Sequence, residues 1–142
     1  MTDENRIILP QKNGLVDFCG EPLNDGDYQG LKDLFGEVFQ FPENEYIGCG
    51  NIGPIGIRDS RVVKVRIYNA QLKRLPETVR YFTQIQEMNL GYNYLRTVVN
   101  QLGDLRNLRE LGLTHNLIPS AEIQELTRRL PHTRIWADEQ VV

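Results

Sequence analysis

The chain has 142 residues, of which 40% are hydrophobic and 25% are charged, and its formal net charge is −3. These values favour one soluble globular domain with a sizeable core. The negative charge argues against a general binder of nucleic acid or of an anionic membrane surface, because both need clustered positive charge. We find neither a run of roughly 20 apolar residues nor an apolar N-terminal leader, so we expect no membrane span and no signal peptide.

Two cysteines and two histidines restrict the chemistry that the chain offers. Cys19 and Cys49 are too few for a disulfide framework, so we expect buried, reduced thiols in a cytoplasmic protein. No cysteine or histidine pair has the spacing of zinc ligands, and we predict no metal site. His115 has no serine or cysteine nucleophile at a defined spacing, so we expect the protein not to be an enzyme.

Residues 1–61 are rich in glycine and do not repeat, since nine of the twelve glycines fall within the first 56 residues. Leu15–Phe18 could form a short strand, and Asn24–Asp27 offers N-cap chemistry for a helix over about 27–38. A strand, a tight turn and a second strand follow at about 55–67. The apolar residues of the predicted helix fall on one face: Tyr28, Leu31, Leu34, Phe35, Val38 and Phe39.

Gly48–Gly53 has the spacing G-x-G-x-x-G, which is the pattern of dinucleotide-binding turns. That motif works between a strand and a helix whose N-terminus meets the pyrophosphate. Here Pro54–Ile57 follows, and it favours a strand or a turn. We therefore interpret the glycines as tight turns, and we predict no cofactor and no small-molecule substrate. A nucleotide-binding or enzymatic protein that uses loop 48–53 and Cys49 remains an alternative.

Residues 62–142 repeat one pattern, at steps of 23, 23 and 24 residues: Val65-x-Ile67, Met88-x-Leu90, Leu111-x-Leu113 and Ile135-x-Ala137. A period in this range is typical of a solenoid. One unit cannot bury its own apolar face, so stacked units form the core together. In the first three units, apolar residues recur at positions 1, 4, 6 and 11: Val62, Val65, Ile67 and Leu72; Ile85, Met88, Leu90 and Leu95; Leu108, Leu111, Leu113 and Ile118.

Position 9 of the repeat is asparagine in two units, Asn93 and Asn116, and alanine in the first, Ala70. An asparagine amide both donates and accepts hydrogen bonds, which suits buried backbone groups where the chain leaves a strand. We therefore predict a structural ladder made by Asn93 and Asn116. At Ala70 we expect an irregular turn, or a turn whose backbone the N-terminal segment satisfies.

With these residues in register, the chain resembles the leucine-rich repeat proteins, L-x-x-L-x-L-x-x-N-x-L, of the roughly 23-residue type. The match covers residues 62 to about 138, and the closing segment is similar to the final helix and strand of many bacterial members. The resemblance implies an α/β fold: a short right-handed leucine-rich repeat solenoid. A parallel sheet of about four strands would line the concave face, with a helical or irregular convex face and an N-terminal α+β cap.

Both ends of such a stack need covering. We expect residues 1–61 to cap the first end, with the helix laid on Val62–Ile67, and residues 62–142 to form the repeats and a C-terminal cap, all as one continuous structural domain. The last helix would begin with Ser120 as N-cap and Glu122 in its first turn. Trp136 and the acidic pair 138–139 would finish the stack.

The outward strand positions 3, 5, 7 and 8 should share the concave face, which is the usual binding surface in the family that the chain resembles. At position 3 we expect Lys64 to face Glu87 and Glu110 to face Arg134, as charge pairing that keeps the sheet soluble. Aromatic and arginine side chains on a rigid sheet are typical of binding hot spots. The predicted protein-binding residues are Arg66, Tyr68, Asn89, Tyr92, Thr114, His115 and Trp136.

The leading hypothesis is a non-enzymatic, cytoplasmic module that binds a protein partner through the concave face, with no nucleic acid and no membrane involved. An alternative is a structural or regulatory subunit of a larger assembly that docks by its edges. The aromatics could also merely pad the sheet. Some exported bacterial effectors carry such repeats, and the N-terminus shows no export signal that would identify this chain as one.

Overall fold

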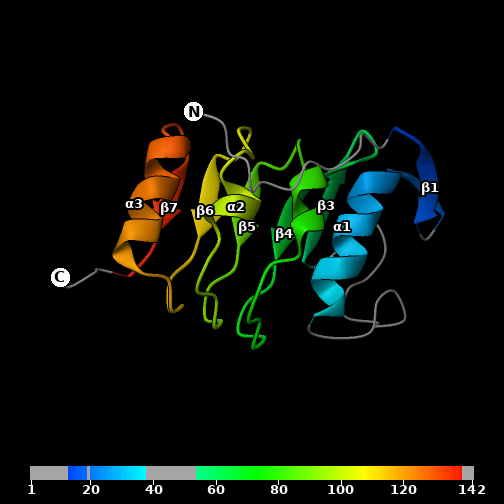
Figure 1. Ribbon diagram of the computed structural model, residues 1–142. Coiled ribbons are helices and arrows are strands. Elements are labelled where there is room, and N and C mark those ends of the chain that lie inside the picture. Colours follow the sequence, from blue (N-terminus) through cyan, green and yellow to red (C-terminus); the bar gives the residue numbers. More distant parts are fainter. Residues whose placement is uncertain (1–12, 19, 38–53, 139–142) are drawn as a thin grey trace.

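The structure is a computed structural model that describes residues 13–18, 20–37 and 54–138. It is a mixed α/β fold built on a five-stranded sheet in the order β3-β4-β5-β6-β7, with a separate antiparallel pair, β1-β2 (Figure 1). Strand β3 pairs antiparallel with β4, and the other neighbours are parallel. The strands are β1 Leu15–Phe18, β2 Glu21–Asn24, β3 Ile55–Arg58, β4 Arg61–Arg66, β5 Glu87–Asn89, β6 Glu110–Gly112 and β7 Arg134–Trp136.

The register of the parallel strands follows the repeat in the sequence. Val65 pairs with Met88, Met88 with Leu111, and Leu111 with Ile135, so each strand pairs the same repeat position of the next unit. A parallel neighbour needs a crossover of a dozen or more residues, and the repeat supplies one in every unit. The predicted set of four parallel strands is therefore β4 to β7, and β3 extends it to five.

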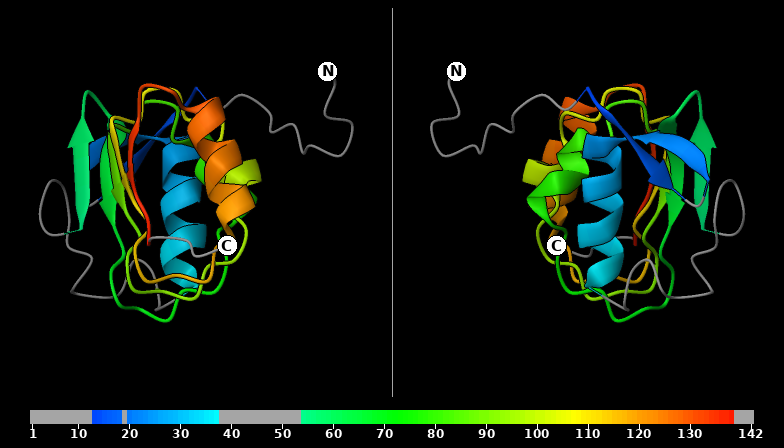
Figure 2. Two further views of the ribbon diagram at one scale, coloured as in Figure 1. Left: turned by 90° about the vertical axis from the view of Figure 1, so that its left-hand side faces the viewer. Right: turned by 90° about the vertical axis from the view of Figure 1, so that its right-hand side faces the viewer.

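Helical segments form a row on one side of the sheet (Figures 1 and 2). Neighbours in this row contact each other in the order α1, η1, α2, α3. No described helix or strand covers the other side of the sheet, which we call the open face (Figure 2). The row comprises α1 Asp25–Gly36, the 3-10 helix η1 Glu77–Tyr81, α2 Val99–Leu102 and α3 Ser120–Arg129.

The core lies between the sheet and the helical row. All the apolar residues that the repeat places at positions 1, 4, 6 and 11 of the first three units are buried. The crossover segments add Leu75, Val79, Phe82, Val98 and Leu102, which are buried from the helical side. Since each strand buries alternate residues, the side chains between them project onto the open face.

The N-terminal helix sits differently from its predicted place. It begins at Asp25, earlier than the predicted 27, because the Asn24 side chain accepts the Asp27 N–H at 3.0 Å as an N-cap. It does not lie over Val62–Ile67 alone but packs beside η1, and it is therefore the first helix of the helical row. Gly30 makes this approach possible, since a Cβ there would lie 2.7 Å from a ring carbon of Phe82.

A buried carboxylate joins this helix to the first repeat strand. The side chain of Asp27 is fully buried, and it accepts the backbone N–H of Val62 at 2.7 Å and the Arg61 guanidinium at 2.9 Å. Burial raises the pKa of the Asp27 carboxyl, and the hydrogen bonds from Arg61 and Val62 oppose that rise.

The prediction that Ser120 caps the last helix is wrong. Pro119 occupies the N-cap position, and Ser120 is the first helical residue. Glu122 of the first turn instead reaches the neighbouring unit, where it accepts the N–H groups of Val98 and Val99, each at 2.9 Å. It thereby caps the start of α2, whose own N-cap residue, Val98, has no polar side chain.

Several sequence predictions lie outside the described residues: those for 1–12, the loop Gly48–Gly53, Cys19, Cys49, Val38, Phe39 and Glu139. Within the described ranges, no group of three or more His, Cys, Asp or Glu residues could hold a metal ion. In the same ranges, no helix has the length and the apolar character needed to cross a bilayer.

Candidate functional site

The Asn ladder supports the turns that follow the strands. The Asn93 side chain accepts the N–H groups of Ala70 and Leu72, each at 3.0 Å, and its amide nitrogen donates to the carbonyl groups of Ile67 and Leu90, each at 2.9 Å. One asparagine therefore satisfies backbone groups of its own unit and of the unit before it.

Asn116 repeats this arrangement one unit further along. It accepts the Leu95 N–H and donates to the Leu90 carbonyl, both at 2.9 Å. The turn at Ala70 needs no asparagine in its own unit, because Asn93 of the next unit accepts the Ala70 N–H. The turn around it is nevertheless irregular, as predicted: φ is positive at Gln71, and at no other described residue in position 10 of a unit.

Three predicted site residues form a stack of rings just beyond the strand ends. Tyr92 and His115 are stacked, with their centroids 4.1 Å apart and an interplanar angle of 11°. Tyr68 lies 5.0 Å from Tyr92 at a tilt of 50°. Both Tyr92 and His115 have positive φ, 58° and 55°, at the turn that leaves the strand. We call Tyr68, Tyr92 and His115 the ring stack.

Hydrogen bonds between neighbouring units hold the backbone under the ring stack. Tyr92 donates its N–H to the Thr114 carbonyl at 2.8 Å, as Asn69 does to Gly91 at 3.1 Å. The His115 N–H donates instead to a side chain: the two carboxylate oxygens of Asp138 accept it at 2.9 and 3.0 Å, where a backbone carbonyl of the next unit accepts the N–H groups of Asn69 and Tyr92. The sequence predicted that Asp138 helps to finish the stack of repeat units, but it did not predict this hydrogen bond to His115.

Gly91 leaves room for the Tyr68 ring beside Tyr92. A Cβ at Gly91 would lie 3.3 Å from a Tyr68 ring carbon, from Asn89 Oδ1 and from Thr114 Oγ1. The same glycine N–H donates to Asn89 Oδ1 at 3.0 Å. Desolvation, with smaller contributions from Tyr92, raises the pKa of the Tyr68 phenol. Asn89 and Thr114 are thus close to the ring stack without belonging to it.

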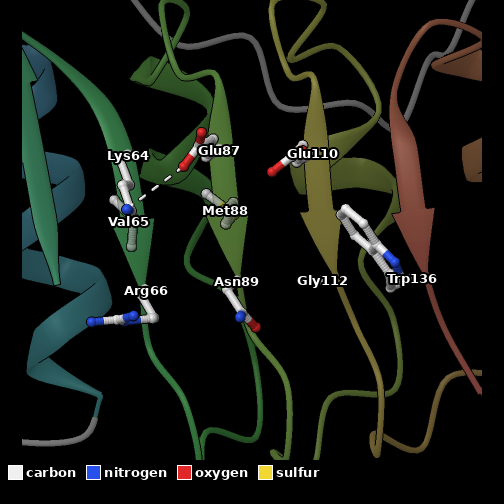
Figure 3. Close-up of a pocket in the computed structure, with 9 residues that line it drawn as sticks. All are labelled: Lys64, Val65, Arg66, Glu87, Met88, Asn89, Glu110, Gly112 and Trp136. Carbon is white, nitrogen blue, oxygen red and sulfur yellow. Dashed lines mark ion pairs between the residues drawn. The ribbon is translucent and has the colours of Figure 1, made fainter.

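Of the other predicted residues, Arg66, Asn89 and Trp136 line a hollow on the open face with a volume of about 190 Å³, whereas Thr114 does not (Figure 3). Met88 and Val65 form part of its wall. Gly112 leaves room beside Asn89, because a Cβ at this glycine would lie 2.9 Å from Asn89 Oδ1. Residues that line the hollow on the open face are Lys64, Arg66, Glu87, Asn89, Glu110, Gly112 and Trp136.

The charged row at position 3 is only half paired. Lys64 contacts Glu87 at 3.7 Å, as predicted. Glu110 is in register with Arg134, but the Arg134 guanidinium lies over the Trp136 ring, 5.6 Å from its centroid. Among the described residues, no ion pair within 4.0 Å includes Glu110. Glu110 therefore faces Arg134 in the register, as predicted, but the expected charge pairing between the two side chains is wrong.

A second hollow, of about 350 Å³, was not expected from the sequence. It lies at the end of α3 and is lined by Arg106, Arg128, Arg129, Leu130, Pro131, His132 and Thr133. Arg129 is already paired with Asp104 at 3.0 Å, and Arg128 with Glu125. Two of the three arginines that line this hollow are thus neutralised by carboxylates of the same chain.

Comparisons with known proteins find little. No protein-family model and no curated protein matches the chain. Among solved structures, the leucine-rich repeat ectodomain of the receptor kinase SOBIR1 from Arabidopsis thaliana is similar at 14% identity, with a TM-score of 0.33. The match covers 81% of this chain and 92% of that one.

Proposed function

We propose that the chain is a leucine-rich repeat solenoid that works as a non-enzymatic, cytoplasmic interaction module and binds a protein partner through the open face. The observation that carries the proposal is the ring stack at the strand ends, together with the exposed Trp136 ring, on a sheet whose other side packs against the helical row. In this proposal residues 1–61 cap the repeats of residues 62–142, and the open face is the concave face.

Exposure and rigidity support this use of the face. Tyr68, Tyr92 and Trp136 are 52%, 42% and 43% exposed. A parallel sheet is normally covered on both sides, so one that no described helix or strand covers on the side with exposed rings is unusual for a protein that works alone. Aromatic side chains with few rotatable bonds lose little entropy on binding, and they are frequent hot spots.

The backbone beneath these rings is held in advance. The cross-unit hydrogen bonds at Tyr92 and His115 and the buried Asn93 fix the turn from which the rings project. A partner would therefore meet a preorganised surface, which lowers the cost of ordering on association.

The test is affinity capture from a lysate of the source cells, followed by quantitative mass spectrometry, with wild type and the double variant Tyr92→Ala/Trp136→Ala. We expect proteins recovered by the wild type to be lost from the variant. The matched control is Tyr94→Ala/Leu117→Ala, which removes two exposed apolar side chains, 51% and 48% exposed, from repeat position 10.

The two double variants should have melting temperatures close to that of the wild type, because they remove exposed side chains. Equal recovery of the same proteins by wild type and Tyr92→Ala/Trp136→Ala would contradict binding through the open face. It would favour docking by an edge of the sheet.

A further inference from the structure

Glu87 and Glu110 place two carboxylates side by side on the open face. They are direct partners in the parallel register of β5 and β6, where neighbouring strands lie about 4.8 Å apart. Like charges at this spacing destabilise a sheet. Lys64 offsets only the Glu87 end of the pair, at 3.7 Å.

The nearby cations leave Glu110 unneutralised. Arg134 is next to Glu110 in the register, but its guanidinium lies over the Trp136 indole. Arg66 also lines the hollow, and Figure 3 shows its side chain pointing away from Glu110. The fold thus keeps a carboxylate at the rim of the hollow without a cation of its own among the described residues.

The residues that line the hollow beside Glu110 suit a flat, positively charged side chain. Gly112 contributes no side chain there, and Trp136, Asn89 and the apolar Met88 line it together with the two glutamates. Carboxylate oxygens accept paired hydrogen bonds from a guanidinium, and a flat guanidinium also stacks on aromatic rings.

We propose that the open face receives an arginine side chain of the protein partner, held between the Glu110 carboxylate and the Trp136 indole. This inference rests on the proposed function and specifies the chemistry of the partner. The incoming cation would give Glu110 the ion pair that Arg134, whose guanidinium lies over the Trp136 ring, does not form with it. Arginine is favoured over lysine because its planar fork matches both the carboxylate and the ring.

The test uses the single tryptophan of the chain, whose indole N–H gives one NMR signal in the hollow. The probes are the capped tripeptides Gly-Arg-Gly and Gly-citrulline-Gly, which differ in charge but hardly in shape. We expect saturable shifts of the Trp136 signal with the arginine peptide, and affinity roughly tenfold or more weaker for citrulline, as the loss of a charged hydrogen bond implies.

Glu110→Gln should lower the affinity for the arginine peptide to the level of citrulline, while Glu125→Gln, which lies on α3, should leave it unchanged. Equal binding of both peptides, no saturable shift, or an unchanged affinity in Glu110→Gln would overturn the proposal. Tighter binding of a Gly-Lys-Gly peptide would overturn the choice of arginine.

Partner capture separates this inference from the proposed function. If Tyr92→Ala/Trp136→Ala loses the partner but Glu110→Gln retains it fully, the open face binds a protein and the arginine assignment fails. If Tyr92→Ala/Trp136→Ala also retains the partner, the proposed function itself fails.

Discussion

The Asn93 side chain accepts the backbone N–H of Ala70 at 3.0 Å, so the asparagine of one repeat unit satisfies the turn of the unit before it. The direction of this bond explains why the first unit tolerates alanine. Each ladder residue satisfies the unit before it, and in the described residues no unit of the repeat precedes the one that contains Ala70.

We expect Asn93→Ala to lower the free energy of unfolding by ~1–3 kcal/mol, because it leaves buried N–H and C=O groups without partners. Asn93 is 4% exposed, whereas Asn116 is only partly buried, so Asn116→Ala should cost less. Urea titration followed by circular dichroism measures both. Asn100→Ala, an exposed position on α2, is the control and should stay within about 0.5 kcal/mol of wild type. No loss in either ladder variant would contradict the ladder.

The strand register was predictable from the sequence because every unit repeats the same burial pattern, and a slip by one residue would expose Met88 and Leu111. The position of the N-terminal helix was not predictable. It depends on the fit of Gly30 against Phe82 and on the hydrogen bond that the Val62 N–H donates to Asp27, and both contacts join residues far apart in the chain. The cap of α2 was missed for the same reason, since Glu122 comes from the next unit.

The same limit applies to the site. Strand alternation predicted which side chains share the open face, because their direction follows from the backbone alone. It could not predict that the Arg134 side chain would lie over Trp136 rather than reach Glu110, since that choice depends on rotamers. The ring stack also depends on positive φ at Tyr92 and His115, which cannot be predicted from the residue types because non-glycine residues seldom adopt positive φ.

Gly30→Ala tests the contact that places the N-terminal helix. Alanine normally stabilises a helix by roughly 0.5–1 kcal/mol relative to glycine. Here its Cβ would lie 2.7 Å from a Phe82 ring carbon and 2.9 Å from the Thr78 carbonyl oxygen. We expect a net loss of ~1–3 kcal/mol from overpacking, measured by urea unfolding. Gly36→Ala in the same helix meets nothing within 4 Å and should not destabilise the fold. A stabilised Gly30→Ala variant would contradict this packing.

Glu110→Gln should stabilise the free protein, because it removes the repulsion between Glu110 and its register partner Glu87. The expected gain in unfolding free energy is about 0.2–1 kcal/mol, and it should shrink as salt screens exposed charges. Glu87→Gln is the comparison: it relieves the same repulsion but loses the contact with Lys64, so its gain should be smaller. Thermal unfolding at low and high salt distinguishes these outcomes, and a destabilised Glu110→Gln would mean that Glu110 has a partner in the free protein.

Asp27 gives the fold a pH dependence whose sign follows from its environment. Burial raises the pKa of its carboxyl above the ordinary 3.8, so the folded state holds the proton more tightly than the unfolded state. Stability from this group is fully present below pH 3.8 and is lost as pH rises through the folded pKa. Asp27→Asn cannot titrate, and its amide oxygen can still accept the Val62 N–H. Urea titrations from pH 3 to 7 should therefore show the asparagine variant gaining stability relative to wild type as pH rises. The opposite trend, with wild type gaining on the variant, would mean that the ion pair with Arg61 outweighs the cost of burying the charge.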